Sequence, residues 1–96
     1  MTSKQRAFLR KMATKIDSVV SIGKNGATPE VVASCDEALE ARELIKCNVL
    51  DNCFDEVKDI AYICGERSRA EVVQVIGRKF VLYRPNKDKP VIELPR

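Results

Sequence analysis

Apolar side chains recur every three or four residues in three stretches of the chain, and this spacing predicts three helices. Ser3 can cap the first helix, and Thr28 followed by Pro29 is a strong start for the second. Gly65 is the expected C-cap of the third. The predicted helices cover residues 3–15, a segment that begins at Thr28, and residues 55–65.

Four further stretches have the pattern and composition of strands. They are residues 18–22, 43–50, 70–76 and 79–84. Between Ile45 and Val49 apolar and polar residues alternate, which predicts one buried face and one outer face that carries Lys46. A short hairpin at Gly77-Arg78 joins the last two strands. Residues 70–76 are almost wholly apolar, so we expect this strand to be central and covered on both sides.

The order of the elements, α-β-α-β-α-β-β, predicts an α/β domain of the two-layer α+β kind with a four-stranded mixed sheet. Ninety-six residues fit one domain, and an apolar fraction of 45% suffices for one core. No apolar run approaches the roughly 18 residues of a membrane span, and the N-terminus lacks the apolar segment of a secretory signal. We therefore expect a cytoplasmic monomer with no membrane association.

Charge is distributed unevenly along the chain, although the net charge is only +3. Residues 1–26 have a balance of +5, residues 27–66 a balance of −7, and residues 67–96 a balance of +5. If the two basic ends meet in space, the molecule has a basic face and an acidic back. This arrangement is typical of nucleic-acid binders, although charges of both signs also keep any small domain soluble.

The cysteines and the absence of histidine restrict the chemistry that the chain can perform. The four cysteines lie 12, 6 and 11 residues apart, without a C-x-x-C pair, and no histidine could complete a zinc site. Cys35, Cys47 and Cys64 fall on predicted apolar faces, whereas Cys53 lies in a turn region and is the one expected at the surface. Since the chain also lacks a nucleophile elbow and a dinucleotide fingerprint, we expect no enzymatic activity, no metal and no cofactor.

Gly23-Lys24-Asn25-Gly26 is the most informative short segment, because it joins a predicted strand to the start of a predicted helix. Glycines permit a positive φ and a close approach of another chain to the backbone. The free N–H groups at a helix start favour an anion, and Lys24 adds a mobile positive charge. A phosphate of an RNA backbone fits such a site. Asn and Gly are also ordinary turn residues, so this loop alone is equally compatible with a plain turn.

Three separated motifs together resemble the CRM family, which includes bacterial YhbY-like proteins and RNA-splicing domains of plant chloroplasts. The motifs are Val19–Gly26, Glu43–Lys46 and Val73–Pro85. The matching positions are Gly23, Lys24, Gly26, Glu43, Leu44, Lys46, Gly77, Tyr83 and Arg84. Ala27 departs from the pattern, since many members have a larger aliphatic residue there.

The resemblance covers nearly the whole chain, so residues 1–96 are expected to form one such domain. It implies a fold similar to the C-terminal domain of translation initiation factor three and RNA binding through the glycine-flanked loop. Stand-alone bacterial members are associated with precursors of the large ribosomal subunit. The partner that the resemblance implies is therefore such an RNA, and the acidic second and third helices allow ribosomal proteins as additional partners.

The candidate RNA-binding residues are the loop and the basic side chains expected around it. They are Gly23, Lys24, Asn25, Gly26, Lys46, Arg67, Arg69, Arg78, Lys79 and Arg84. Each basic residue has an alternative as a solvated charge, at a helix end for Arg67 and Arg69 or at a hairpin tip for Arg78 and Lys79.

The chain has only three phenylalanines and two tyrosines, and Tyr83 is expected to pack in the core. The chain thus has few aromatic side chains that could stack on single-stranded bases. We expect it to recognise the phosphates and the shape of the RNA instead. The alternative function is a protein–protein adaptor that docks its acidic second and third helices on a ribosomal protein.

Overall fold

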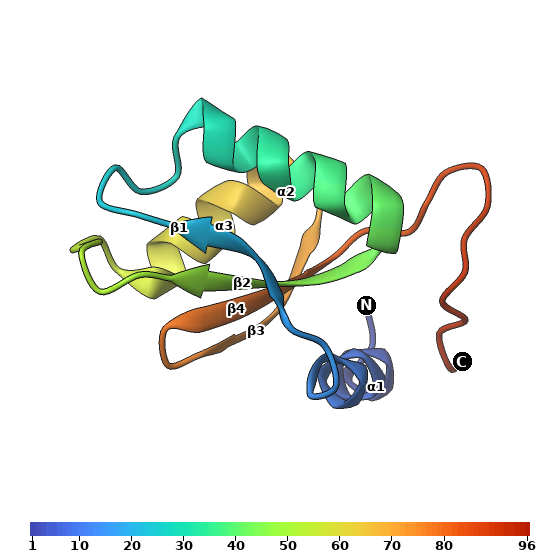
Figure 1. Cartoon of the computed structure of the whole chain (residues 1–96). Coiled ribbons are helices and arrows are strands. Elements are labelled where there is room, and N and C mark those ends of the chain that lie inside the picture. Colours follow the sequence, from blue (N-terminus) through green and yellow to red (C-terminus); the bar gives the residue numbers. More distant parts are fainter.

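Three helices and four strands follow one another in the order that the sequence predicts (Figure 1). The computed structural model describes residues 1–96. The elements are α1 (Ser3–Ala13), β1 (Ser18–Ile22), α2 (Pro29–Arg42), β2 (Leu44–Val49), α3 (Val57–Arg67), β3 (Glu71–Ile76) and β4 (Lys79–Tyr83). The predicted α+β class is confirmed. No helix has both the length and the apolar character that crossing a membrane requires.

The four strands form one mixed sheet in the order β1-β2-β4-β3. β1 runs parallel to β2, and the other two pairs are antiparallel. The prediction that residues 70–76 form a central strand is wrong, because β4 returns between β2 and β3 and leaves β3 at the edge. Val75 and Ile76 are accordingly exposed. The expected cover on both sides holds for the first half of β3, where Val72 packs against the larger core and Val73 lies in the cluster under α1.

The sheet buries both of its faces, but to different extents. One face packs with α2 and α3 around Phe80, Ile45 and Leu39, and this is the larger core. On the other face α1 places Leu9 and Ala13 in a smaller cluster with residues of β2, β3 and β4. The sheet with α2 and α3 gives the two predicted layers, and α1 adds a partial third layer below the sheet in Figure 1.

The caps of the helices are partly as predicted. Thr28 caps α2 by accepting a hydrogen bond from Val31 N at 3.2 Å, as its position before Pro29 indicates. The prediction for Ser3 is wrong, since Thr2 caps α1 in a capping box with Gln5.

Gly65 is likewise not a C-cap, because α3 continues to Arg67 and its C-cap is Ser68. Gly65 is buried where a Cβ would lie 2.9 Å from Cγ2 of Val72. The lack of a side chain at residue 65 therefore serves packing of α3 against β3.

All four cysteines are buried and free. This confirms the prediction for Cys35, Cys47 and Cys64 and contradicts it for Cys53, which is only 1% exposed. The loop after β2 turns back toward the core, with Cys53 N donating to Leu50 O at 3.0 Å. The turn-like composition around Cys53 therefore did not predict its burial.

The segment after β4 is tied to the body of the protein by Glu43, which ends α2 with a φ of 66°. Glu43 is only 3% exposed, and its carboxylate accepts hydrogen bonds from Asn86 N at 2.7 Å, Val91 N at 2.9 Å and Ile92 N at 2.8 Å. Burial by itself would raise the pKa of Glu43, but these three donors outweigh it and lower the pKa below its usual range. Glu43 is therefore an ionised anchor for the C-terminal segment.

Candidate nucleic-acid interface

Three loops from separate parts of the chain meet at one end of the sheet. β1 and β2 are parallel, so the loops that follow them emerge at the same edge. The β3–β4 hairpin joins them because β4 runs antiparallel to β2. Leu50 N donates to Ile22 O at 2.9 Å, and Val49 N donates to Arg78 O at 2.7 Å. The three turns lie together at the left of Figure 1.

The Gly23–Gly26 loop is a tight turn with an accessible outer side. Gly26 N donates to Gly23 O at 3.1 Å, and Gly26 has a φ of 68°. A Cβ on Gly26 would lie 2.5 Å from Oδ2 of Asp55, whereas nothing lies within 4 Å of a Cβ on Gly23. Lys24 and Asn25 between them are exposed. The loop thus offers backbone that a phosphate can approach, beside a free ammonium group.

Arg78 has a bracing role that the sequence did not indicate. Its guanidinium donates to Leu50 O at 2.6 Å, Cys53 O at 3.0 Å and Val49 O at 3.3 Å. These contacts hold the loop after β2 against the hairpin. The positive charge remains at the surface, because the acceptors are neutral carbonyls and Arg78 is exposed.

Lys46 and Lys79 lie on the sheet face that α1 only partly covers. Asn48 of β2 pairs with Lys79 of β4, and Lys46 pairs with Val81, so these side chains project from one face. Lys79 is exposed and Lys46 is half-buried. The predicted outer position of Lys46 is confirmed, and the two ammonium groups extend the basic surface from the hairpin along the sheet.

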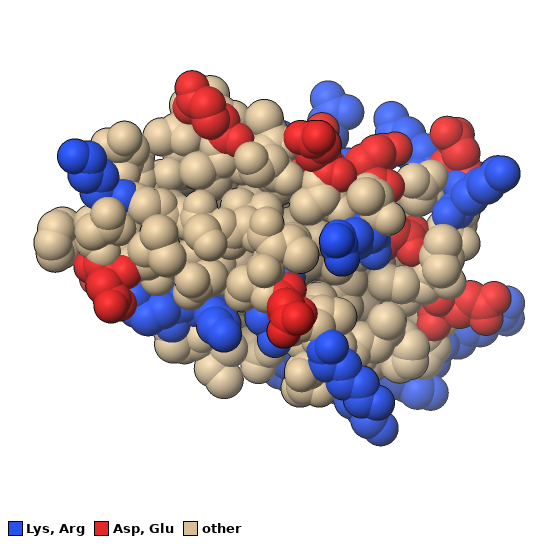
Figure 2. Space-filling model, viewed as in Figure 1, with Lys and Arg blue, Asp and Glu red and all other residues tan.

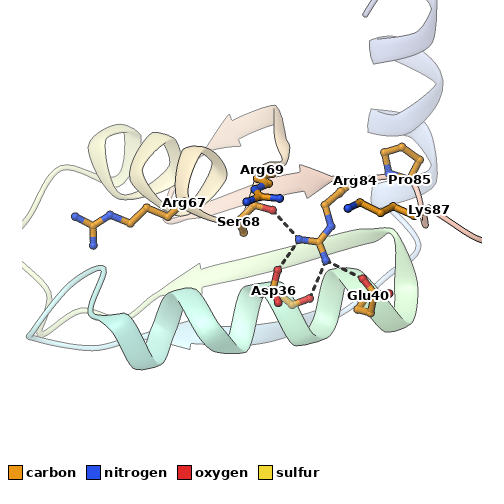
Figure 3. A pocket seen from close by; sticks show the side chains of 8 residues that line it. All are labelled: Asp36, Glu40, Arg67, Ser68, Arg69, Arg84, Pro85 and Lys87. Atoms are coloured by element: carbon orange, nitrogen blue, oxygen red, sulfur yellow. Dashed lines mark hydrogen bonds and ion pairs between the residues drawn. The ribbon is translucent and has the colours of Figure 1, made fainter.

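The remaining predicted residues, Arg67, Arg69 and Arg84, lie at the other end of the sheet. Arg84 follows the last residue of β4, whereas Arg78 precedes its first. Together with Lys87 they border a polar hollow of about 660 Å³ (Figure 3). The ten candidate residues therefore form two separate groups, and one continuous site does not contain them all.

Arg84 forms ion pairs and hydrogen bonds within the protein. Its guanidinium lies 2.6 Å from Asp36 Oδ1 and 3.2 Å from Glu40 Oε2, and it donates to Ser68 O at 2.7 Å (Figure 3). The two carboxylates offset its charge, so Arg84 connects α2 to the end of α3. Arg67 and Arg69 are exposed beside it and have no such partner.

The two basic ends of the chain do meet in space. Arg6 Nη1 donates to Val72 O at 2.6 Å, and Gln5 Nε2 donates to Pro95 O at 3.0 Å. In Figure 2 acidic side chains follow α2 along the upper margin, and Lys and Arg side chains lie both in the lower half of the view and among the acids at its upper right. Both signs mix toward the C-terminal segment, so the separation into a basic face and an acidic back is partial.

Phe54 is a surface feature that sequence reasoning passed over. It lies in the loop after β2, and its side chain is 93% exposed. The one signal in the sequence is that Phe54 belongs to no apolar stripe of a helix or strand and has an acidic residue beside it.

Comparison with known proteins agrees with the fold. A family model described as the CRS1 / YhbY (CRM) domain matches residues 1–84. The Bacillus subtilis protein named "Probable RNA-binding protein YqeI" is 42% identical over 95 residues, which cover 99% of each chain. A Haemophilus influenzae protein named "RNA-binding protein" is 36% identical over 96 residues, which cover 100% of this chain and 96% of that protein. A Staphylococcus aureus protein of known solution structure is 45% identical, with a TM-score of 0.83 over 99% of both chains. The chain belongs to the CRS1/YhbY (CRM) domain family.

Proposed function

We propose that this protein binds structured RNA through the end of the sheet where the Gly23–Gly26 loop lies. The RNA is a precursor of the large ribosomal subunit, and the protein acts on it in the cytoplasm as a monomeric, non-enzymatic assembly factor. Phosphate groups approach the open side of Gly23 beside Lys24, and Lys79 and Lys46 extend the contact along the sheet. The names of the relatives support RNA binding, and the resemblance to stand-alone bacterial members suggests the ribosomal precursor.

The observation that carries the proposal is the convergence of three loops around an accessible glycine backbone. Gly26 N is used within the turn, but the space around Gly23 is open and Lys24 is exposed. Arg78 adds charge at the neighbouring hairpin while it fixes the loop after β2. Such a site recognises backbone and shape and carries little base specificity of its own.

Binding to purified large-subunit ribosomal RNA over a salt series tests the proposal. Four phosphate contacts on single-stranded RNA predict a log–log slope of about −2.8, which is roughly a fiftyfold loss of affinity between 50 and 200 mM salt. Lys24→Glu should weaken binding and reduce the slope by about 0.7, the contribution of one contact. Lys89→Glu changes the net charge equally in the exposed C-terminal segment and serves as the matched control.

Equal binding by the wild type and Lys24→Glu, with both proteins folded, would refute the role of the loop. Equal losses in Lys24→Glu and Lys89→Glu would show that binding follows overall charge alone.

A protein–protein adaptor is the second candidate, and the exposed acids of α2 are the observation that favours it. Asp36 and Glu40 stay 61% and 67% exposed although they pair with Arg84. Binding of a basic ribosomal protein that is lost in a Glu37→Lys variant, together with a weak salt dependence for RNA, would favour the adaptor. Glu37 is an exposed residue of α2 with no ion-pair partner.

A further inference from the structure

We propose that Phe54 is a base-stacking residue, whose ring supports one unpaired nucleotide beside the Gly23–Gly26 loop. The inference rests on the proposed function and adds to it the class of RNA element that is recognised. The RNA would be a helix with an adjoining unpaired base, such as a bulge, a loop or a single-stranded extension.

The loop that carries Phe54 is fixed to the body of the protein just before Phe54, whereas the ring itself lies in solvent. The preceding residue, Cys53, is buried, and its carbonyl accepts a hydrogen bond from Arg78 Nη2 at 3.0 Å. Asp55, which follows, places its carboxylate beside Gly26, since Oδ2 lies 2.5 Å from where a Cβ on Gly26 would be. Single exposed apolar residues are common on proteins. Here, however, a backbone anchored at the buried Cys53 presents a large aromatic ring that is 93% exposed.

Phe54 also borders a shallow hollow of about 450 Å³ between its loop and the β3–β4 hairpin. Val57 and Val75 form part of the lining, and Arg78 lies at one side. The hollow is thus partly apolar and has room for a planar group beside the phenyl ring. Proteins that bind single-stranded RNA stack its bases on an aromatic ring that lies next to a basic phosphate site.

The charges around the ring determine where the base and the phosphate of a nucleotide can lie. Three acids, Asp51, Asp55 and Glu56, and two cations, Lys58 and Arg78, line the hollow, so its lining has a net charge of −1 and favours an uncharged base over a phosphate. Lys24 on the adjacent loop attracts one instead. A nucleotide whose phosphate lies at Lys24 and whose uncharged base lies on Phe54 satisfies both conditions. One ring among charged side chains suits a stacked base better than a protein partner, whose docking needs a broader apolar patch.

Binding of two RNA probes by Phe54 variants tests the inference. One probe is a hairpin with a four-nucleotide single-stranded extension, and the other is a fully paired duplex of equal length. Phe54→Ala should lose about 5- to 150-fold in affinity for the first probe, which corresponds to about 1–3 kcal/mol per stacked base. Affinity for the duplex should not change. Phe54→Leu should lose as much as Phe54→Ala because a leucine has area but no aromatic face, and Phe54→Tyr should retain binding.

A Phe54→Trp variant provides a direct readout, since the chain contains no tryptophan. Addition of the extended hairpin should quench the tryptophan fluorescence, because a base stacks on the indole ring. Addition of the duplex should leave the fluorescence unchanged. The side chain is almost fully exposed, so all of these variants should remain folded.

Equal affinities of the wild type, Phe54→Ala and Phe54→Leu for the extended hairpin would overturn the stacking role. If Lys24→Glu still weakened binding in that case, the proposed function would stand. A loss in Phe54→Ala that Phe54→Leu restores would indicate apolar contact, as with a protein partner, and would also overturn it. A wild type that binds neither probe nor ribosomal RNA would instead remove the proposed function itself.

Discussion

Glu43 provides the sharpest test of how this fold is held together. The residue ends α2, and its backbone is bound on both sides, with Glu43 N donating to Leu39 O at 2.8 Å and Arg84 N donating to Glu43 O at 2.9 Å. These bonds hold the φ of 66°, which costs a residue with a Cβ about 1–2 kcal/mol. The carboxylate receives three backbone N–H groups of residues 86–92.

Replacing Glu43 by alanine removes the acceptors and keeps the backbone strain. One hydrogen bond to a charged group contributes about 1.5–3 kcal/mol. The freed N–H groups can reach water once the C-terminal segment detaches, so the three contributions do not add fully. We expect Glu43→Ala to lower the free energy of unfolding by about 2–4 kcal/mol. Glu43→Gly should lose about 1 kcal/mol less, because glycine adopts a positive φ without strain.

Urea denaturation of the wild type, Glu43→Ala, Glu43→Gly and Glu43→Gln measures these differences. With a denaturant slope of about 1.5 kcal/mol per molar, a loss of 3 kcal/mol lowers the midpoint by about 2 M. A loss below about 0.5 kcal/mol in Glu43→Ala, or a Glu43→Gly variant less stable than Glu43→Ala, would refute the reasoning.

The same anchor predicts a dependence on pH. The pKa of Glu43 is lower in the folded than in the unfolded protein, so its contribution is fully present above the unfolded value of about 4.3. The contribution falls as the pH drops through the folded pKa. The difference in stability between the wild type and Glu43→Gln should therefore shrink between pH 6 and pH 3. A difference that stays constant over this range would contradict an ionised anchor.

Two further predictions concern the core. Gly65→Ala should destabilise the protein by about 1–3 kcal/mol in urea denaturation, because the new Cβ meets Cγ2 of Val72. A Val72→Ala change in the same chain should recover part of this loss, and the absence of any recovery would contradict the contact. The thiols should be inert, since a hydrogen bond with Cys47 raises the pKa of Cys35 to about 12 and a hydrogen bond with Cys35 and burial raise the pKa of Cys64. A disulfide reagent should titrate four thiols only after unfolding, and fast reaction of one thiol in the native protein would argue against this burial.

Local signals in the sequence determined the elements and the candidate loop. The N-cap at Thr28 and the hairpin at Gly77-Arg78 depend on residues a few positions apart, and both are present as predicted. The Gly23–Gly26 turn belongs to the same class. Its glycines and its position between a strand and a helix are visible in the sequence because the bonds that define it close over three residues.

The tertiary structure decided the features that depend on distant parts of the chain. The apolar composition of β3 does not reveal that β4 inserts beside β2 and leaves β3 at the edge, because strand order follows from pairing over many residues. Cys53 is buried although its neighbours are turn residues. Arg78, which lies 25 positions later in the chain, donates a hydrogen bond to the Cys53 carbonyl and holds this loop against the hairpin. The candidate residues divide into two groups because the elements that carry them end at opposite ends of the sheet, as Arg78 and Arg84 show on either side of β4. The types of side chain along the chain predict the chemistry that is possible. Long-range contacts decide which side chains are buried and which lie side by side. The exposure of Phe54 is one such outcome of the tertiary structure.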